Sequence, residues 1–289
     1  MTSTALILVL LTSFAWVGFD VLRKLLVERI PPVTLIFLIT VGQVPLFGAW
    51  ALIDGWSLPP GAYWPPALIA GAMTVVASVA FVQALHIAPL SVIVPLLSLT
   101  PVFTLISAIP LLGEVPTPRQ VVGVLLVVFG AWWLQRDASA AESDAEQRRR
   151  GRQGFWLMVL VAVFWSVGPV LDKVAMRHAS APVHAFWLCS AVSLGLLVLL
   201  LGRGNLAEMR KLRDVPGLFG LSLLTSAAAL AFQMLAIQVV LVSVVETVKR
   251  GVGNVAALVI GARFFGESVS VAKVLAGLLM GLGVALIVL

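Results

Sequence analysis

Ten apolar runs divide this chain, and they constrain its fold more than any other feature. An α-helix needs roughly 20 apolar residues to cross the hydrocarbon core of a bilayer, and hydrophobic residues make up 61% of the chain against 11% charged ones. We therefore predict an all-α membrane protein with ten transmembrane helices. The predicted spans are residues 4–22, 32–53, 66–87, 91–112, 119–135, 155–174, 182–202, 216–237, 240–262 and 271–289.

One connection between the spans is long, and it divides the chain into two halves. Residues 136–153 mix small, acidic and basic side chains without an apolar period, so we expect a charged flexible linker between residues 1–135 and 154–289. Met1–Leu22 lacks a basic leader region and a small-residue cleavage site, and we interpret it as the first span. The single cysteine, Cys189, lies in an apolar run, which excludes disulfides and cysteine-built metal sites.

Short motifs recur in the same order in both halves. The first span of each half carries a short motif that begins with Phe, continues with a Trp and ends with Val-Gly. The third span of each half carries Gln-x-Leu-x-Ile, and Gly-Glu follows the fourth. Three matches in one order indicate duplication. Because each half holds an odd number of spans, the halves cross the membrane in opposite senses, and such inverted repeats bind cargo at their interface. The matched segments are 14–18 with 164–168, 83–87 with 233–237, and 113–114 with 266–267.

The basic residues indicate topology. The loops after the odd-numbered spans, with their flanks, hold fourteen of the 19 Lys and Arg residues, whereas the opposite side holds three. The positive-inside rule places the 136–153 linker in the cytoplasm and both termini outside. The net charge of +6 is thus explained by the loops, and we expect no nucleic-acid partner.

Three formal charges interrupt the span 240–262, at Glu246, Lys249 and Arg250. Each would cost roughly 2.5–3.5 kcal/mol if it faced lipid, so all three must face protein, water or a solute. One interpretation is a structural ion pair, since Glu246 can reach Lys249 at i+3 and Arg250 at i+4. The other is a solute site that keeps net positive charge, because one carboxylate cannot neutralise two cations. We prefer the second and add Asn254 to this site.

The roles of the other polar residues in the spans have two interpretations, solute binding and contact between helices. Gln83 and Gln233 occupy matching positions and could hold a solute or bridge helices. Trp16, in the first span, completes the candidate substrate-binding set. The spans 91–112 and 240–262 are the least regular of their halves, since one carries prolines and the other glycines, and this irregularity is typical of a cavity-lining pair. The prolines of 91–112 could equally be kinks whose freed carbonyls are satisfied by neighbouring Ser and Thr hydroxyls.

Charged residues near the ends of spans favour structural roles. Asp172 and Lys173 predict a snorkelling or gate salt bridge rather than a solute contact. Glu114 and Glu267 precede the fifth and tenth spans, where we expect local capping and turn formation.

The whole pattern resembles the EamA-type branch of the drug/metabolite transporter superfamily, and the likeness covers nearly the whole chain. It rests on the Trp and Gly of each first span, on Pro101-Val102-Phe103-Thr104 and on Leu112-Gly113-Glu114. The resemblance implies two inverted five-helix EamA-like repeats. It also implies a transporter, without choosing among amino acids, phosphorylated or nucleotide sugars, and small drugs.

These observations predict a secondary transporter that moves a small polar or anionic metabolite across the plasma membrane, as an exporter or exchanger driven by a solute or ion gradient. The alternative is a membrane assembly or flippase-type subunit that acts on a lipid-linked substrate. No hydrolase, redox or nucleotide-binding signature occurs, so we expect no enzyme activity, cofactor or metal. The oligomeric state stays open, with a homodimer as one alternative.

Overall fold

The computed structural model of the protein describes residues 2–87, 97, 99–136, 145–203, 205–264 and 271–288. These parts are built from α-helices and two 3-10 helices, η1 (Gly61–Tyr63) and η3 (Asn205–Asp214). The α-helices are α1 (Ser3–Val27), α2 (Pro32–Ile53), α3 (Trp64–Ile87), α5 (Thr100–Leu112), α6 (Pro118–Arg136), α7 (Ala145–Ala175), α8 (Ala181–Arg203), α9 (Pro216–Val239), α10 (Val242–Phe264) and α11 (Val271–Val288).

Each predicted span overlaps one of these helices. The span 91–112 is described only at residue 97 and from residue 99, where α5 covers its second half. Six of the helices are long and apolar enough to cross a membrane, and α10 is not among them because Glu246, Lys249 and Arg250 interrupt it. The six segments are Ser3–Val27, Pro32–Ile53, Gly61–Ala84, Arg152–Ala175, Ala181–Gly202 and Pro216–Val239.

Turn and cap residues set several helix boundaries. Pro32 and Pro216 occupy the first turns of α2 and α9, where a missing N–H breaks no helical hydrogen bond. Gly113 ends α5 in the left-handed conformation, with φ of 70°. Thr117 and Gln120 form a reciprocal capping box at the start of α6: each backbone N–H donates to the other side chain, at 2.9 and 3.3 Å.

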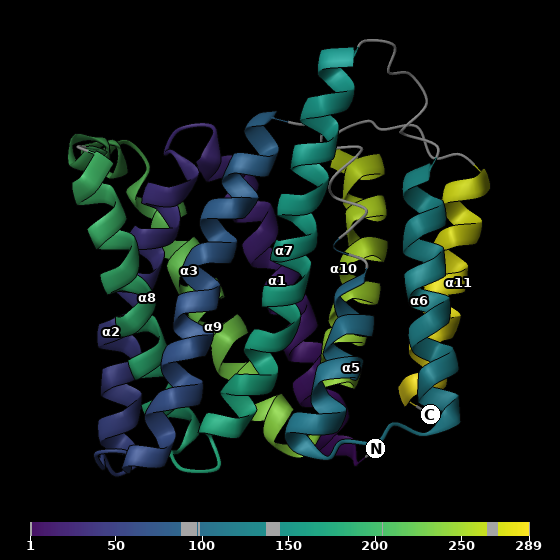
Figure 1. Cartoon of the computed structure of the whole chain (residues 1–289), viewed down its shortest axis with the longest axis horizontal. Helices are drawn as coiled ribbons and strands as arrows, with labels where there is room; N and C mark the ends of the chain where they lie inside the picture. Colours follow the sequence, from purple (N-terminus) through teal and green to yellow (C-terminus); the bar gives the residue numbers. More distant parts are fainter. Residues whose placement is uncertain are drawn as a thin grey trace.

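The structure differs from the expectation of a flexible linker over residues 136–153. Helix α6 continues to Arg136 and α7 begins at Ala145, so residues 145–153 are helical, while 137–144 lie outside the described residues. Ala, Glu, Gln and Arg dominate this stretch, and all four are good helix formers. The absence of an apolar period therefore indicated exposure to water and not the absence of a helix. In Figure 1 this polar part of α7 projects beyond the other helices.

The two chain ends lie at one face of the helical layer and the start of α7 at the other (Figure 1). Helix α1 begins at the face of the termini, whereas α7, the first helix of the second half, begins at the opposite face. We call these the termini face and the linker face. The first helices of the two halves thus run in opposite directions.

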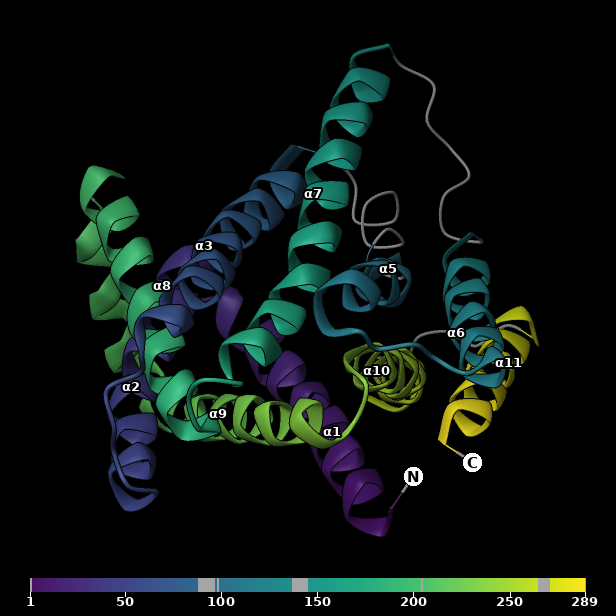
Figure 2. The same ribbon diagram turned by 60° about the horizontal axis from the view of Figure 1, so that its bottom comes forward.

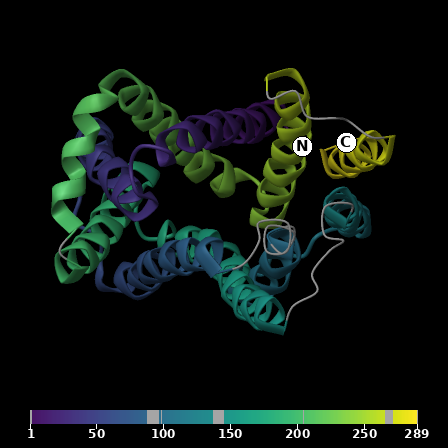
Figure 3. The same ribbon diagram turned by 90° about the horizontal axis from the view of Figure 1, so that it is seen from above.

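The helix packing is nearly unchanged when the two halves are exchanged. Helix α3 packs on α7 as α1 packs on α9, and α5 packs on α7 as α1 packs on α10. The pairs α2 with α8, α5 with α10, and α6 with α11 each join equivalent helices of the two halves. Figure 2 shows α6 and α11 side by side at one end of the molecule. Viewed from above in Figure 3, α1 (purple), α9 (green) and α10 (yellow-green) lie along one side, with α3 (blue) and α7 (teal) along the other.

Candidate functional site

A cavity of about 650 Å³ lies between the two halves. Helices α1, α2 and α3 of the first half and α7, α8, α9 and α10 of the second contribute to its wall. This volume falls within the roughly 300–1,000 Å³ of small-molecule sites. The polar and charged residues in the wall are Ser13, Asp20, Arg23, Lys24, Thr40, Gln43, Thr74, Ser78, Asp172, Cys189, Ser226, Gln233, Glu246, Lys249, Arg250 and Asn254.

Helix α10 presents its charged residues to the cavity from one face. Glu246, Lys249, Arg250, Gly253 and Asn254 all line the cavity, and their spacing of three and four residues places them on one side of an α-helix.

The opposite side of α10 packs against a neighbouring helix. A Cβ atom at Gly251 would come within 2.5 Å of Val284 in α11, so this position needs the close approach that glycine permits. The helix is therefore anchored on one face and polar on the other.

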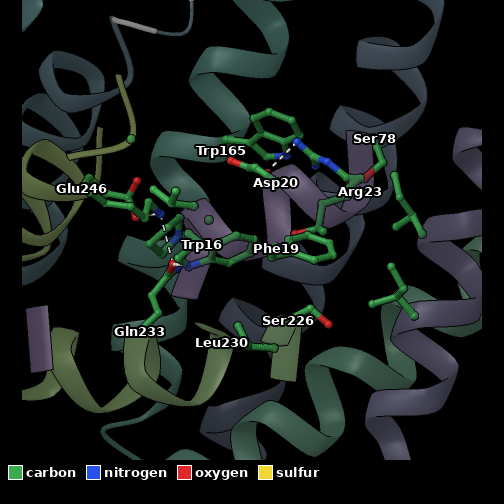
Figure 4. A pocket seen from close by; sticks show the side chains of 18 of the residues that line it. Trp16, Phe19, Asp20, Arg23, Ser78, Trp165, Ser226, Leu230, Gln233 and Glu246 are labelled. Carbon is green, nitrogen blue, oxygen red and sulfur yellow. Dashed lines mark hydrogen bonds and ion pairs between the residues drawn. The ribbon is translucent and has the colours of Figure 1, made fainter. Parts of the chain in front are cut away.

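Lys249 is the centre of a polar network that joins three helices. Its Nζ atom donates to Glu246 Oε1 at 2.6 Å and to Gln233 Oε1 at 3.0 Å. The same Gln233 oxygen accepts a hydrogen bond from Trp16 Nε1 at 2.7 Å, and Lys249 Nζ lies 5.4 Å from the centroid of the Trp16 ring. Figure 4 shows Trp16, Gln233 and Glu246 converging on this point from α1, α9 and α10. The Glu246 side chain is 2% exposed and that of Lys249 is 15% exposed, so the pair is largely shielded from water.

Arg250 has a different partner. Its Nε atom donates to Thr100 Oγ1 at 3.0 Å, at the first residue of α5. Thr100 in turn lies one turn before Thr104, whose hydroxyl donates to the Thr100 carbonyl at 2.9 Å. The structure thus assigns Glu246 to Lys249, and Arg250 reaches across to the other half of the molecule. We expected that Glu246 could pair with both cations. Among the hydrogen bonds and ion pairs of the described residues, it pairs with Lys249 and not with Arg250.

A second group of charges lies where the cavity approaches the linker face. Arg23 Nη2 contacts Asp20 Oδ1 at 2.9 Å, and Lys24 occupies the last turn of α1. All three line the cavity, and Figure 4 shows Asp20 and Arg23 together on its wall. Counting both groups with Asp172, four basic and three acidic side chains line the cavity, so its formal charge is positive.

A cluster of polar contacts closes the termini face. Lys173 Nζ donates to Glu114 Oε1 at 2.6 Å and to the Val240 carbonyl at 2.9 Å, and the Val242 N–H donates to Glu114 Oε2 at 2.8 Å. We call Glu114, Lys173 and the start of α10 the latch. Glu114 and Lys173 line a separate hollow of about 440 Å³ on the termini face, whereas Asp172, one residue earlier, lines the main cavity. Consecutive residues of α7 thus line different spaces.

The comparisons with known proteins agree with this architecture. The sequence profile of the EamA-like transporter family matches residues 3–135 and again residues 152–289. The chain belongs to the EamA-like transporter family. With its apolar helices it is therefore a multi-pass membrane protein and a transporter of the drug/metabolite type.

The structural comparison supports the fold of this EamA-like protein. One solved crystal structure matches 100% of this chain and 97% of its own, with a TM-score of 0.79 and 18% sequence identity. At this identity the likeness shows the fold alone. The comparison with curated proteins gave no match.

Six of the seven residues predicted for the site of this EamA-like protein line the cavity: Trp16, Gln233, Glu246, Lys249, Arg250 and Asn254. Gln83 does not. Its side chain is exposed, because the face of α3 that lines the cavity carries Thr74 and Ser78, and Gln83 lies five residues after Ser78, on a different side of the helix. The structure therefore gives no support to Gln83 as a substrate contact.

Asn254 lines the cavity and also contacts α11, because its side-chain amide donates to Met280 Sδ at 3.6 Å.

Two further expectations need correction. Glu114 does not cap the following helix, because Thr117 and Gln120 already cap α6, and its carboxylate instead binds α10 and Lys173. Glu267 lies outside the described residues. Lys173 does form a salt bridge near a cavity end, but Asp172 has a different partner, His184.

Sequence reasoning missed part of the cavity wall. Gln43 Nε2 donates to Ser226 Oγ at 3.0 Å, and Cys189 Sγ donates to Gln43 Oε1 at 3.4 Å. These three residues come from α2, α9 and α8. A lone glutamine or serine in an apolar run is a weak signal, and only the packing of the helices brings them together. Among the described residues, no group of His, Cys, Asp or Glu side chains could hold a metal ion.

Proposed function

We propose that this EamA-like protein is a secondary transporter that binds a small polar solute, preferably an anion, in the cavity between its two halves. The observation that carries the proposal is the wall of α10, where two cations face the cavity and one carboxylate compensates only Lys249. Ionisable residues inside a membrane protein mark solute pathways by default. Arg250 offers a guanidinium, which has more donors than the one that bonds to Thr100 among the described residues, and a guanidinium suits carboxylate or phosphate groups.

Ten spanning helices in two inverted five-helix repeats are part of the proposal. Two observations support it: α1 and α7 begin at opposite faces of the molecule, and the helix contacts are nearly unchanged when the two halves are exchanged. Inverted repeats provide alternating access when one repeat rocks against the other around a fixed site. In this state the cavity wall reaches Arg23 and Lys24 toward the linker face, and the latch closes the termini face. Transport would then require the latch to open and the linker side to close.

We place the linker face in the cytoplasm and the protein in the plasma membrane, working as an exporter or exchanger. The distribution of basic residues supports this orientation. A reporter that is active only outside the cytoplasm, fused after Leu289, should be active, and the same reporter inserted within residues 137–144 should be inactive. The reverse pattern would invert the orientation and leave the fold unchanged.

A flippase-type subunit that acts on a lipid-linked substrate is the competing function. The two are separated by reconstitution into liposomes. A panel of carboxylate and phosphate metabolites is first screened by thermal shift, since a ligand that binds the folded state stabilises it by RT ln(1 + [L]/Kd). We expect a stabilising metabolite to show counterflow in proteoliposomes, and Lys249→Met to abolish it. Activity only on a lipid-linked substrate would reject the proposal in favour of the flippase.

A further inference from the structure

Three titratable side chains form a buried chain beside the cavity, and the proposed solute site does not use them. The Tyr63 hydroxyl lies 3.0 Å from His184 Nδ1, and His184 Nε2 lies 3.1 Å from Asp172 Oδ1. Tyr63 and His184 are 0% exposed and Asp172 is 5% exposed. The three residues come from η1, α8 and α7, so tertiary packing alone assembles them.

This arrangement can hold one more proton without losing a hydrogen bond. With a neutral ring, His184 Nε2–H donates to the Asp172 carboxylate and Nδ1 accepts from the Tyr63 hydroxyl. When Nδ1 takes a proton, both ring nitrogens donate, and the Tyr63 hydroxyl rotates so that its oxygen accepts. The imidazolium then faces a carboxylate, and the formal charge of the three groups changes from −1 to zero.

The surroundings of the ring contain few other groups that could take the proton. Of the described residues, Tyr63 comes from η1 and Asp172 from α7, and Cys189 is on α8 itself. Helices α2, α3 and α9 also pack on α8, and the polar residues that they contribute to the cavity between them and α8 include Gln43, Thr74, Ser78 and Ser226, none of which titrates.

Asp172 is the member of the chain that lines the cavity, whereas His184 and Tyr63 are not part of its wall. Asp172 therefore links the ring to the cavity: when His184 becomes an imidazolium, the carboxylate whose charge it neutralises is one that lines the cavity. The next residue, Lys173, belongs to the latch. Asp172, which lines the cavity, is thus adjacent in α7 to Lys173, which forms the latch contact with Glu114.

We propose that Asp172, His184 and Tyr63 form a proton-binding site that couples proton uptake to anion binding in the cavity. Protonation removes one negative charge from the wall of a cavity whose remaining excess is positive, so proton and anion binding favour each other, and by linkage each strengthens the other equally. Proton and solute then move in the same direction, and their two gradients set the net direction. The coupling rests on the proposed function, but the proton site itself does not.

The first experiment observes the ring directly and needs no solute. The chain contains three histidines, so the variant His86→Gln/His178→Gln leaves His184 as the only one. Its ring, labelled with ¹⁵N and observed by NMR in lipid nanodiscs, should change from the singly to the doubly protonated form as the pH is lowered. Adding Asp172→Asn should abolish this change, because the imidazolium would be buried without its carboxylate. A ring that stays neutral throughout, or that titrates identically in Asp172→Asn, would overturn the proton site.

The second experiment tests the coupling with sulfate, an anion that keeps its charge over this pH range. Thermal stabilisation by sulfate should be larger near pH 6 than near pH 8 in the wild type and in His178→Gln, which removes an exposed histidine from the turn after α7. His184→Gln and Asp172→Asn should each make it independent of pH. Equal stabilisation at both pH values in the wild type overturns the coupling. If sulfate never stabilises the protein although the ring titrates, the anion site of the proposed function fails and the proton site stands.

Discussion

Lys249 is held by three groups at once, and each offsets part of the cost of placing an ammonium inside a membrane. Glu246 supplies the opposite charge at 2.6 Å, Gln233 a second acceptor at 3.0 Å, and the Trp16 ring an aromatic face. A cation on an aromatic ring contributes about 0.5–2 kcal/mol, depending on how dry it is. Arg250 bonds only to Thr100 among the described residues, so we propose that its other donors serve a solute.

Arg250→Lys tests this assignment. A lysine keeps the charge but loses the planar fork and the Nε bond to Thr100. We expect the Kd for an anionic solute found in the screen to rise roughly 10–100-fold, since a hydrogen bond to a charged group contributes about 1.5–3 kcal/mol. Arg263→Lys is the matched control, because Arg263 lies exposed in the last turn of the same helix and should tolerate the change. Equal affinities of Arg250→Lys and the control would remove Arg250 from the site.

Whether a residue lies in the cavity wall was predictable from the sequence where local periodicity decides it, and was not predictable where packing decides it. Glu246, Lys249, Arg250 and Asn254 share a face of one helix, which the 3.6-residue period predicts directly. Gln83 was chosen by analogy with Gln233, but the repeats are related by approximate symmetry, and only the second glutamine lines the cavity. His184 carried no signal, because its partners Tyr63 and Asp172 are 121 and 12 residues away in the chain.

At the scale of helices, α6 and α11 pack through glycines that allow their backbones to touch. A Cβ atom at Gly283 would lie 2.7 Å from the Gly123 carbonyl oxygen and 2.9 Å from Val127 Cγ2. At Gly130 it would lie 2.7 Å from Met280 Cγ. Small residues at such crossings are typical of membrane proteins, where van der Waals contact replaces the hydrophobic effect as the driving force.

Gly283→Leu should therefore push α6 and α11 apart. Overpacking of this kind costs about 1–3 kcal/mol, so the variant should melt at a lower temperature in detergent than the wild type. Gly281→Leu is the control on the same helix, since nothing lies within 4 Å of a Cβ atom at that position. If both variants melt alike, the close crossing does not stabilise the protein.

The helical elements themselves were largely predictable from the sequence. Apolar length and the prolines and glycines at helix ends predicted α2 to its observed bounds, Pro32–Ile53. The start of α7 was missed because this polar stretch has no apolar period, which is the signal that identifies a helix from sequence. The pairing of α3 with α7 and of α1 with α9 also had no local signal, since it joins residues from different halves.

At the scale of the whole molecule, we propose that the latch decides which face the cavity serves. Glu114 is 8% exposed on its side chain and Lys173 is 21% exposed, so their ion pair is partly shielded from water. Together with the Val242 N–H it joins the end of α5, the end of α7 and the start of α10. The helices that must separate to open the termini face therefore meet at this one cluster.

Lys173→Met should weaken the latch and open the cavity to the termini face. Cys189 is the only cysteine of the chain and lines the cavity, so it reports access without engineered probes. We expect its reaction with a membrane-impermeant thiol reagent applied at the termini face to accelerate by about tenfold, equivalent to a latch contribution of about 1.4 kcal/mol. Arg177→Met serves as control, because Arg177 lines the same hollow but donates only to the Leu112 carbonyl among the described residues. Unchanged labelling in Lys173→Met would show that other contacts close this face.

The central claim is that Lys249 and Glu246 belong to a solute site and are not only a structural pair. Breaking the pair from one side, with Lys249→Met or Glu246→Gln, should cost about 3–5 kcal/mol of stability, because it leaves a buried charge without its partner. The double variant Glu246→Gln/Lys249→Met removes both charges and should recover stability. Melting temperature and solute counterflow are measured on the same preparation of the double variant. Our account predicts a recovered melting temperature without counterflow, and recovery of both would contradict it.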